Sequence, residues 1–497
     1  MLAVVIPGRA RIVHESGWVK MLLSGGRVLR NFGFMMGGRF LGDASIFLLI
    51  VVWSRVYGQV GIGQYSFAVA VSGFFAAFAG FGLYPYSVKE LARSRAPLAT
   101  VYGRILSLRL LLTVAALAIL LLVVPFLPFT REFKLVIVII GVYQLMSELV
   151  QGLTAVFVAK EEAHISAMLG VSRKAASAAA GIAVALSGGS LVVATGMLPA
   201  ISALHLLAVY GIVTKRYGRP ALVASVSSIR NQVREALPYA ASRFLSQASS
   251  RVDIVLVGFL IGAGGAGVYN VAYRVVFLLA LVPRFAALSL FPRASTLYAD
   301  SVSDFSELYH RSLNLIVLLG LPIAAGVWLI APDLVLLTFG EEFREAASVL
   351  RILTVMLFFT FVSRTAAIFL MACDRQAVRT WGYLNATWVT VAAGLLLIPR
   401  FGIEGAAVAA VLSEAVPAIL FVVWLRPVVG WPRMSSRLVI GGLGAASFCA
   451  AFVLLPALPM SVVIPASVLI YAATLVLFKE TRTSEVRALV GIVRRSR

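Results

Sequence analysis

The chain has 497 residues, of which 61% are hydrophobic and 13% are charged, about half the charged share of an average soluble domain. This composition excludes a water-soluble globular protein. The formal net charge is +22, which in a soluble protein would indicate nucleic-acid binding. In a chain this apolar we interpret it as loop charge that sets membrane orientation, so no nucleic-acid partner is expected.

The residue types that carry enzyme and metal chemistry form no recognisable pattern. The two cysteines, Cys373 and Cys449, lie far apart, and the four histidines are scattered. No HExxH, GxSxG or P-loop spacing occurs. We therefore expect no disulfide framework, no metal site, no cofactor and no enzymatic activity.

Apolar segments fill most of the chain after its first 34 residues, which are basic and show no cleaved signal peptide. They recur about every 25 to 45 residues, and a bilayer core needs about 20 apolar residues per helix. We predict an all-α polytopic membrane protein of about fourteen transmembrane helices. The expected helices are 35–57, 62–84, 104–126, 134–158, 165–187, 190–213, 238–262, 266–290, 311–331, 346–371, 380–399, 404–425, 437–456 and 460–478.

Basic residues gather in alternate loops between these segments. The positive-inside rule places such loops in the cytoplasm, so both termini are predicted to be cytoplasmic and the protein to lie in the cell membrane. An even number of spans agrees with this orientation. The basic loops and tail contain Lys89, Arg93, Arg95, Lys215, Arg216, Arg219, Arg230, Arg234, Arg375, Arg379, Arg426, Arg433, Arg437, Arg487, Arg494, Arg495 and Arg497.

Two segments of the chain repeat each other at an offset of 204 residues. Residues 39–45 (RFLGDAS) and 243–249 (RFLSQAS) share five of seven residues, and the same offset pairs Gly63-x-Tyr65 with Gly267-x-Tyr269. Chance similarity between apolar helices is the alternative. The in-register pairs favour a duplication of six helices, with both halves inserted in the same direction as in many transporters.

The duplication predicts two pseudo-symmetric six-helix lobes followed by two further helices. The expected organisation is a basic cytoplasmic segment (1–34), an N-terminal lobe (35–213), a basic linker (214–237), a C-terminal lobe (238–425), two more helices (426–478) and a basic tail (479–497).

Several arginines lie inside the expected helices, where each costs about 2.5–3.5 kcal/mol if it faces lipid. Snorkelling to the interface is the alternative for those near a helix end. Arg251 lies too deep for this, and Arg243, Gln247 and Arg251 share one face of their helix with serines. A polar stripe of this kind predicts a water-filled cavity of positive character. The candidate binding residues are Arg39, Arg243, Gln247, Arg251 and Arg274.

The acidic residues inside the spans are fewer. Asp43, Glu148 and Asp253 are candidates for coupling transport to a proton or cation. Each could instead pair with an arginine, and Arg39 lies one turn from Asp43. The face of Glu148 could also serve hydrogen bonds between helices.

Five short segments resemble a known family. Residues 61–68 (GIGQYSFA), with 81–83 (FGL) and 89–93 (KELAR), look like the start of the polysaccharide-transporter (Wzx-type) oligosaccharide flippases, and residues 267–273 (GVYNVAY) and 401–407 (FGIEGAA) are similar to later parts. These flippases belong to a superfamily that also contains lipid II flippases and multidrug and toxin extruders.

This resemblance implies a flippase that moves a polyprenyl pyrophosphate-linked oligosaccharide to the outer leaflet by alternating access. It further implies a cationic cavity, to which Arg39, Arg243, Arg251 and Arg274 would contribute. The expected partners are this anionic lipid-linked glycan and the bilayer, with a monomer that could contact a glycan polymerase or ligase. A cation-coupled multidrug exporter is the alternative, and a membrane glycan polymerase is a more distant one.

Overall fold

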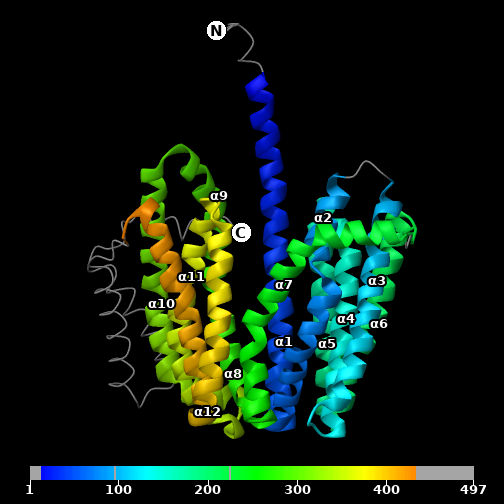
Figure 1. Cartoon of the computed structure of the whole chain (residues 1–497), viewed down its shortest axis with the longest axis vertical. Coiled ribbons are helices and arrows are strands. Elements are labelled where there is room, and N and C mark those ends of the chain that lie inside the picture. Colours follow the sequence, from blue (N-terminus) through cyan, green and yellow to red (C-terminus); the bar gives the residue numbers. More distant parts are fainter. Residues whose placement is uncertain (1–12, 94–96, 223–224, 432–497) are drawn as a thin grey trace. The chain divides into compact units, whose positions relative to one another are not determined.

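The computed structural model describes residues 13–93, 97–222 and 225–431, and all regular secondary structure in these ranges is helical. Two short 3-10 helices, Val124–Phe126 and Glu341–Phe343, follow α3 and α10. The α-helices (Figure 1) are α1 (Val13–Gly80), α2 (Leu83–Arg93), α3 (Leu98–Val123), α4 (Arg131–Ala159), α5 (Ala163–Leu186), α6 (Leu191–Tyr217), α7 (Val226–Leu260), α8 (Ala263–Leu279), α9 (Leu281–Asp300), α10 (Val302–Phe339), α11 (Ala346–Ala372) and α12 (Gln376–Val429).

The predicted all-α membrane fold is confirmed. Among the described residues, eight helices are long and apolar enough to cross a membrane. The backbone leaves the helical region at Gly58 in α1 (φ 66°) and at Gly402 in α12 (φ 59°). Positive φ favours glycine, so each kink divides its helix where the sequence predicted a break between two spans. The expected helices 437–456 and 460–478 lie outside the described residues, so the count of fourteen stays a prediction.

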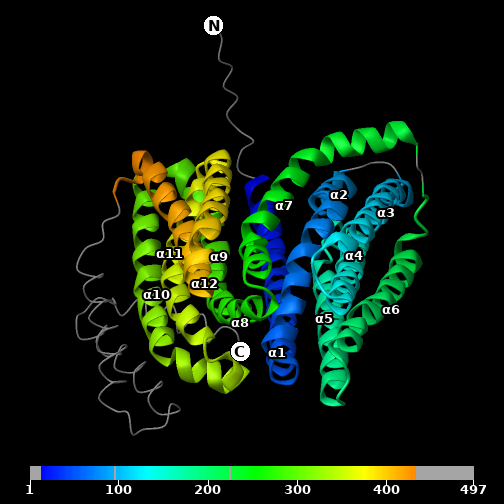
Figure 2. The same ribbon diagram turned by 60° about the horizontal axis from the view of Figure 1, so that its bottom comes forward.

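Helix α7 begins earlier than predicted. Its first residue is Val226, twelve residues before the expected start, and Pro238 lies inside the helix rather than opening it. Ile229, Val233 and Ala236 recur at spacings of four and three, so they form one apolar face. Figure 2 shows this first part of α7 lying across the ends of α2 and α3 before the helix turns, and proline is a common cause of such a bend.

The chain divides into two compact units. The first unit comprises Met1–Val52 and Ser72–Phe244, and the second comprises Trp53–Val71 and Leu245–Arg497. The boundary near Phe244 falls close to the expected start of the C-terminal lobe. The segment Trp53–Val71 belongs to the second unit although the sequence analysis counted it with the N-terminal lobe.

Aromatic and aliphatic side chains hold each unit together. In the first unit, Tyr86 and Tyr102 share a buried cluster with Phe157 and Ala236, so the start of α7 is part of this core. In the second unit, Phe305, Phe369 and Phe421 form a corresponding cluster between α10, α11 and α12. Burial of such side chains contributes to stability through removal of apolar area from water or headgroups and through close packing.

Two glycines of the predicted duplication meet inside the second unit. A Cβ atom on Gly63 would overlap the carbonyl group of Ala263, and one on Gly267 would overlap that of Gln59. Both pairs reflect the 204-residue offset, since residue 59 corresponds to 263 and residue 63 to 267. The contact is therefore reciprocal, as it is at a two-fold axis. This reciprocity supports the duplication and explains why Trp53–Val71 packs with the second half of the chain.

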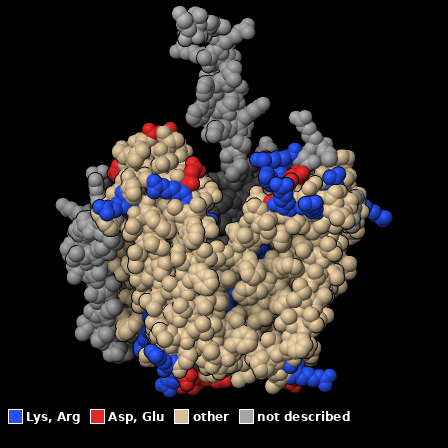
Figure 3. All heavy atoms as spheres, viewed as in Figure 1, with Lys and Arg blue, Asp and Glu red and all other residues tan. Residues whose placement is uncertain are grey.

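Charged side chains are distributed as a multi-pass membrane protein requires. On the face shown in Figure 3, lysines, arginines and acidic residues lie mostly at the two ends of each unit, and the broad band between them is almost free of visible charge. Exposed apolar residues such as Leu111, Leu122, Leu204 and Leu337 belong to the long helices of this band. In water such a surface would be costly, whereas lipid solvates it.

The glycine contact can be tested with alanine. We expect Gly63→Ala and Gly267→Ala each to destabilise the protein by about 1–3 kcal/mol, because overpacking displaces the facing backbone. The measurement is the midpoint of thermal unfolding of the detergent-purified protein. Gly211→Ala in α6 is the matched control, since a Cβ there meets no atom within 4 Å. Equal midpoints for all three variants would contradict the close approach.

Candidate functional site

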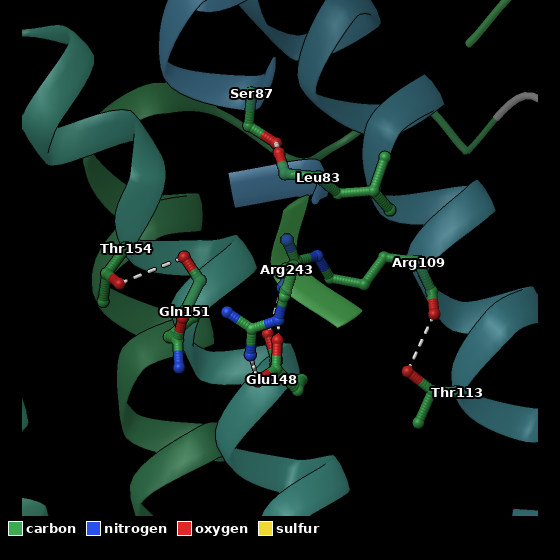
Figure 4. A network of polar contacts seen from close by, with 8 residues as sticks. All are labelled: Leu83, Ser87, Arg109, Thr113, Glu148, Gln151, Thr154 and Arg243. Carbon is green, nitrogen blue, oxygen red and sulfur yellow. Dashed lines mark hydrogen bonds and ion pairs between the residues drawn. The ribbon is translucent and has the colours of Figure 1, made fainter. Parts of the chain in front are cut away.

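A buried carboxylate lies between two arginines in the first unit. Glu148 of α4 is 4% exposed and Arg109 of α3 is 0% exposed. One oxygen of Glu148 is 3.8 Å from the Nη1 atom of Arg109, and the other accepts a hydrogen bond from Nη2 of Arg243 in α7. Figure 4 shows this group of three side chains, which ties α3, α4 and α7 together.

Two glycines leave room for these long side chains. A Cβ on Gly152, one turn beyond Glu148, would lie 2.6 Å from Cδ of Arg109. A Cβ on Gly80, at the end of α1, would lie 2.5 Å from a carboxylate oxygen of Glu148 and 3.0 Å from Nε of Arg243. Since real Cβ atoms do not approach so closely, any larger residue at either position would displace the ion cluster.

The cluster carries an excess of positive charge. Arg173 of α5 lies 5.4 Å from the ring centre of Tyr143 and interacts electrostatically with Glu148. Two guanidinium groups thus contact the carboxylate, and a third lies within electrostatic range of it. Within the described residues, no hydrogen-bond acceptor faces Nε or Nη2 of Arg109, Nε of Arg243 or Nη1 of Arg173. Buried donors without acceptors are costly, and they are chemically suited to an anion.

Arg243 is more accessible to an incoming ligand than the two residues it is clustered with, Arg109 and Glu148. Its side chain is 36% exposed, whereas those of Arg109 and Glu148 are 0% and 6% exposed. An anion could therefore replace Glu148 as the partner of Arg243. Glu148 would keep Arg109 as a counter-charge, which also donates a hydrogen bond to the backbone carbonyl of Glu148.

A second polar group lies in the second unit. The two oxygens of Asp253 accept hydrogen bonds from the backbone of Ile254 at 2.8 Å and from the hydroxyl of Tyr269 at 2.9 Å. Half-buried Arg251 lies on the same helix and interacts electrostatically with Asp253. The carboxylate of Asp253 is thus held by neighbours on α7 and α8.

Helices α11 and α12 contribute a further acid and a further arginine to this unit. Ser363 donates a hydrogen bond of 2.6 Å to Glu414, and the guanidinium of Arg364 lies 5.6 Å from the ring centre of Tyr383. Ser363 and Arg364 of α11 thus contact Glu414 and Tyr383 of α12, so these two contacts join the two helices.

The other predicted residues fall in different places. Asp43 pairs with Lys174 of α5 at 2.7 Å, and the side chain of Arg39, its expected partner, lies outside the described residues. Gln247 of α7 and Arg274 of α8 are half-buried. The structure thus brings Arg243 together with Glu148, and Arg251 together with Asp253, while Asp43 belongs to a separate pair.

The sequence analysis missed Arg109, Arg173 and Lys174. Arg109 stands alone in the apolar run of residues 108–112 (LRLLL), five residues after the start of its expected span at residue 104. Because this position is within two turns of a helix end, snorkelling accounts for it as well as burial does, and depth alone does not single it out as it does Arg251. Arg173 and Lys174 lie in a helix of small residues, where a charged pair stands out less.

A sequence model of the polysaccharide biosynthesis protein family matches residues 28–298, more than half of the chain. The chain belongs to this family. The resemblance to the polysaccharide-transporter family is thereby confirmed.

Individual relatives agree with this family membership. The probable low-salt glycan biosynthesis flippase Agl15 of Haloferax volcanii is 26% identical over 274 residues, which cover 52% of this chain and 58% of that protein. The lipopolysaccharide biosynthesis protein WzxC of Escherichia coli is 23% identical over 44% of this chain and 45% of its own. The chain thus spans only about half the length of these two relatives.

A solved structure extends the comparison to nearly the whole fold. The lipid II flippase MurJ superposes with a TM-score of 0.75, covering 92% of this chain and 99% of its own. At 13% identity this likeness shows a shared fold.

The ion cluster generates a stability prediction. We expect Glu148→Gln to destabilise the protein by about 3–5 kcal/mol, because it leaves buried guanidinium groups without a counter-charge. Thermal unfolding in detergent measures the change. The double variant Glu148→Gln with Arg109→Met should lose less than the sum of the two single variants. Strictly additive losses would contradict a direct interaction between these residues.

Proposed function

We propose that the protein is a flippase that moves a polyprenyl pyrophosphate-linked oligosaccharide from the cytoplasmic to the outer leaflet by alternating access. The observation that carries this proposal is the cluster of Arg109, Arg173 and Arg243 around a single carboxylate. Its excess positive charge suits a pyrophosphate. Membership of the polysaccharide biosynthesis family and the names of Agl15 and WzxC support the choice of a lipid-linked glycan.

In the proposed binding step, a pyrophosphate oxygen replaces Glu148 at the exposed guanidinium of Arg243. Charge-assisted hydrogen bonds of this kind are short and strong, and they are strongest where water is scarce. Glu148 retains Arg109, so the exchange leaves no isolated buried charge. We further propose Arg39, Gln247, Arg251 and Arg274 as binding residues, on the basis of their charge or polarity and their helices.

Coupling to a proton or cation is proposed for Asp43, Glu148 or Asp253. Asp43 and Asp253 have partners, Lys174 and Tyr269, that the binding step leaves in place. Glu148 differs because the pyrophosphate would take one of its partners. The binding step therefore changes the surroundings of Glu148 directly, which favours it as the coupling residue.

The proposed setting is the cell membrane, with both termini in the cytoplasm. The basic residues at the end of α2 and between α6 and α7 support this orientation through the positive-inside rule. We propose a monomer that passes its glycan to a polymerase or ligase. No resident cofactor or metal enters this mechanism.

The competing function is a cation-coupled multidrug exporter. Such a protein would need carboxylates available to a cationic drug. In the first unit two guanidinium groups contact one carboxylate and a third lies within electrostatic range of it, and in the second unit Asp253 and Glu414 both accept hydrogen bonds from hydroxyl groups. A glycan polymerase would need a sizeable loop outside the membrane to carry its reacting groups. The connection between α10 and α11 has only six residues, which disfavours this function.

Translocation of a fluorescent polyprenyl pyrophosphate-linked oligosaccharide in proteoliposomes tests the proposal. We expect Arg243→Gln and Arg251→Gln each to slow transport at least about tenfold, since loss of one charged hydrogen bond has this magnitude. Arg243→Lys, which keeps the charge, should retain part of the activity. Arg131→Gln, an exposed position at the start of α4, is the control. Full activity of both glutamine variants would contradict the charge-based mechanism.

Deletion of the gene separates the two transport functions. We expect the deletion strain to lose a surface glycan and to keep its resistance to cationic drugs, because the passenger is an anionic glycolipid. Glycan analysis and growth assays with a panel of organic cations measure these outcomes. Drug sensitivity with an intact glycan would favour the exporter.

A further inference from the structure

A polar cavity lies beneath the first part of α7, within the first unit. It has a volume of about 570 Å³, a size typical of small-ligand sites. Its walls come from the end of α2, the start of α3 and the start of α7, and they include Tyr86, Glu90, Arg104, Asn231 and Glu235. None of these residues takes part in the ion cluster around Glu148.

Gln232 is the strongest sign that this cavity is built for a ligand. Its side chain lines the cavity and is 6% exposed. The amide nitrogen donates a hydrogen bond of 3.1 Å to the hydroxyl of Ser228, whereas no donor within the described residues reaches Oε1. A buried amide oxygen without a donor is costly, so a small rotation of this side chain toward a ligand that supplies a hydroxyl or amine would relieve the cost.

The charges that line the cavity do not form a site for a phosphate or a metal ion. Glu90 and Glu235 both interact electrostatically with the hydroxyl of Tyr86, and so does the single guanidinium of Arg104. The two carboxylates form no ion pair among the described residues and outnumber the one lining cation, so the cavity wall itself offers no cationic cluster to a phosphate. Arg104 in turn opposes a metal cation.

A neutral polyhydroxyl compound fits this set of groups. Each sugar hydroxyl is both donor and acceptor, so it can donate to a carboxylate or to the oxygen of Gln232 and accept from Arg104 or Asn231. We propose that this cavity is a carbohydrate subsite, which holds the glycan of the lipid-linked oligosaccharide before translocation. This inference rests on the proposed function and adds a second recognition site to it.

The position of the cavity agrees with such a role. It lies at the end of the first unit where α2 ends and α3 and α7 begin, the end that the basic loops assign to the cytoplasm. The first part of α7, which lies across the ends of α2 and α3 (Figure 2), contributes five of its lining residues and continues through Pro238 to Arg243. One helix therefore connects the sugar subsite with the arginine proposed to hold the pyrophosphate.

Binding of the glycan without its lipid provides the test. The probe is the reducing oligosaccharide released by mild acid from the lipid-linked pool of the source cells. It is titrated against the full-length protein in nanodiscs by saturation-transfer-difference NMR. The variants are Gln232→Leu and the double change Glu90→Gln with Glu235→Gln. Glu132→Gln, an exposed acid at the other end of the unit, is the matched control.

We expect the dissociation constant of the released glycan to rise at least about tenfold in both cavity variants and to stay unchanged in the control. Polyprenyl pyrophosphate without sugar should bind all proteins equally. The double carboxylate variant keeps the inference testable if Gln232→Leu does not fold. Absence of glycan binding to the wild type, or equal affinity in all variants, would overturn the subsite.

Transport kinetics relate the subsite to the proposed function. We expect the cavity variants to raise the half-saturating concentration of the lipid-linked oligosaccharide while leaving the maximal rate near that of the wild type. If the cavity variants leave the half-saturating concentration unchanged, the cavity binds only the free sugar. That outcome would refute a role of the subsite in transport. Full activity of both Arg243→Gln and Arg251→Gln would refute the charge mechanism alone, because glycan binding is measured independently of it.

Discussion

Charge that is buried away from water must be paired, and this constraint organises the first unit. Glu148 is held between Arg109 and Arg243, and Gly80 and Gly152 leave the space that these side chains need. The ion cluster and the two glycines thus hold α1, α3, α4 and α7 in one arrangement. Removal of a single partner would destabilise the protein by several kcal/mol, because it leaves a buried charge without compensation. A different packing of these helices would separate the partners and have the same effect.

The ion cluster is not the most stable solution available to these helices. Apolar residues of similar volume are often as stable as a buried ion pair, or more so. The surplus of guanidinium groups adds a further cost. This cost is understandable if the surplus serves an anionic passenger, and the exposure of Arg243 shows where such a passenger would make contact. The polar cavity beneath α7 has the opposite charge balance and suits the uncharged part of the same molecule.

The duplication constrains the second unit through close backbone contacts rather than through charge. Gly63 and Gly267 allow two backbones to approach closely, and the reciprocal contacts with Ala263 and Gln59 relate the first half of the chain to the second. Small residues permit such approaches between membrane helices, where dispersion forces replace the hydrophobic effect as the source of attraction. The paired motifs of the sequence therefore mark the place where the two halves of the duplication pack together in the second unit.

The sequence by itself determined the membrane class, the positions of most helices and the kinks near Gly58 and Gly402. These properties depend on the length of apolar runs and on local backbone preference, which neighbouring residues encode. Arg243 was likewise predicted as a functional candidate from the polar face that it shares with Gln247 and Arg251, and Glu148 from its position as an acid inside an apolar helix.

Only the tertiary structure decided which charges meet. Glu148 pairs with residues 39 and 95 positions away, Asp43 pairs with Lys174, and the cavity at Gln232 needs three helices to form. Such partnerships depend on which faces of distant helices pack together, and no local pattern records that choice.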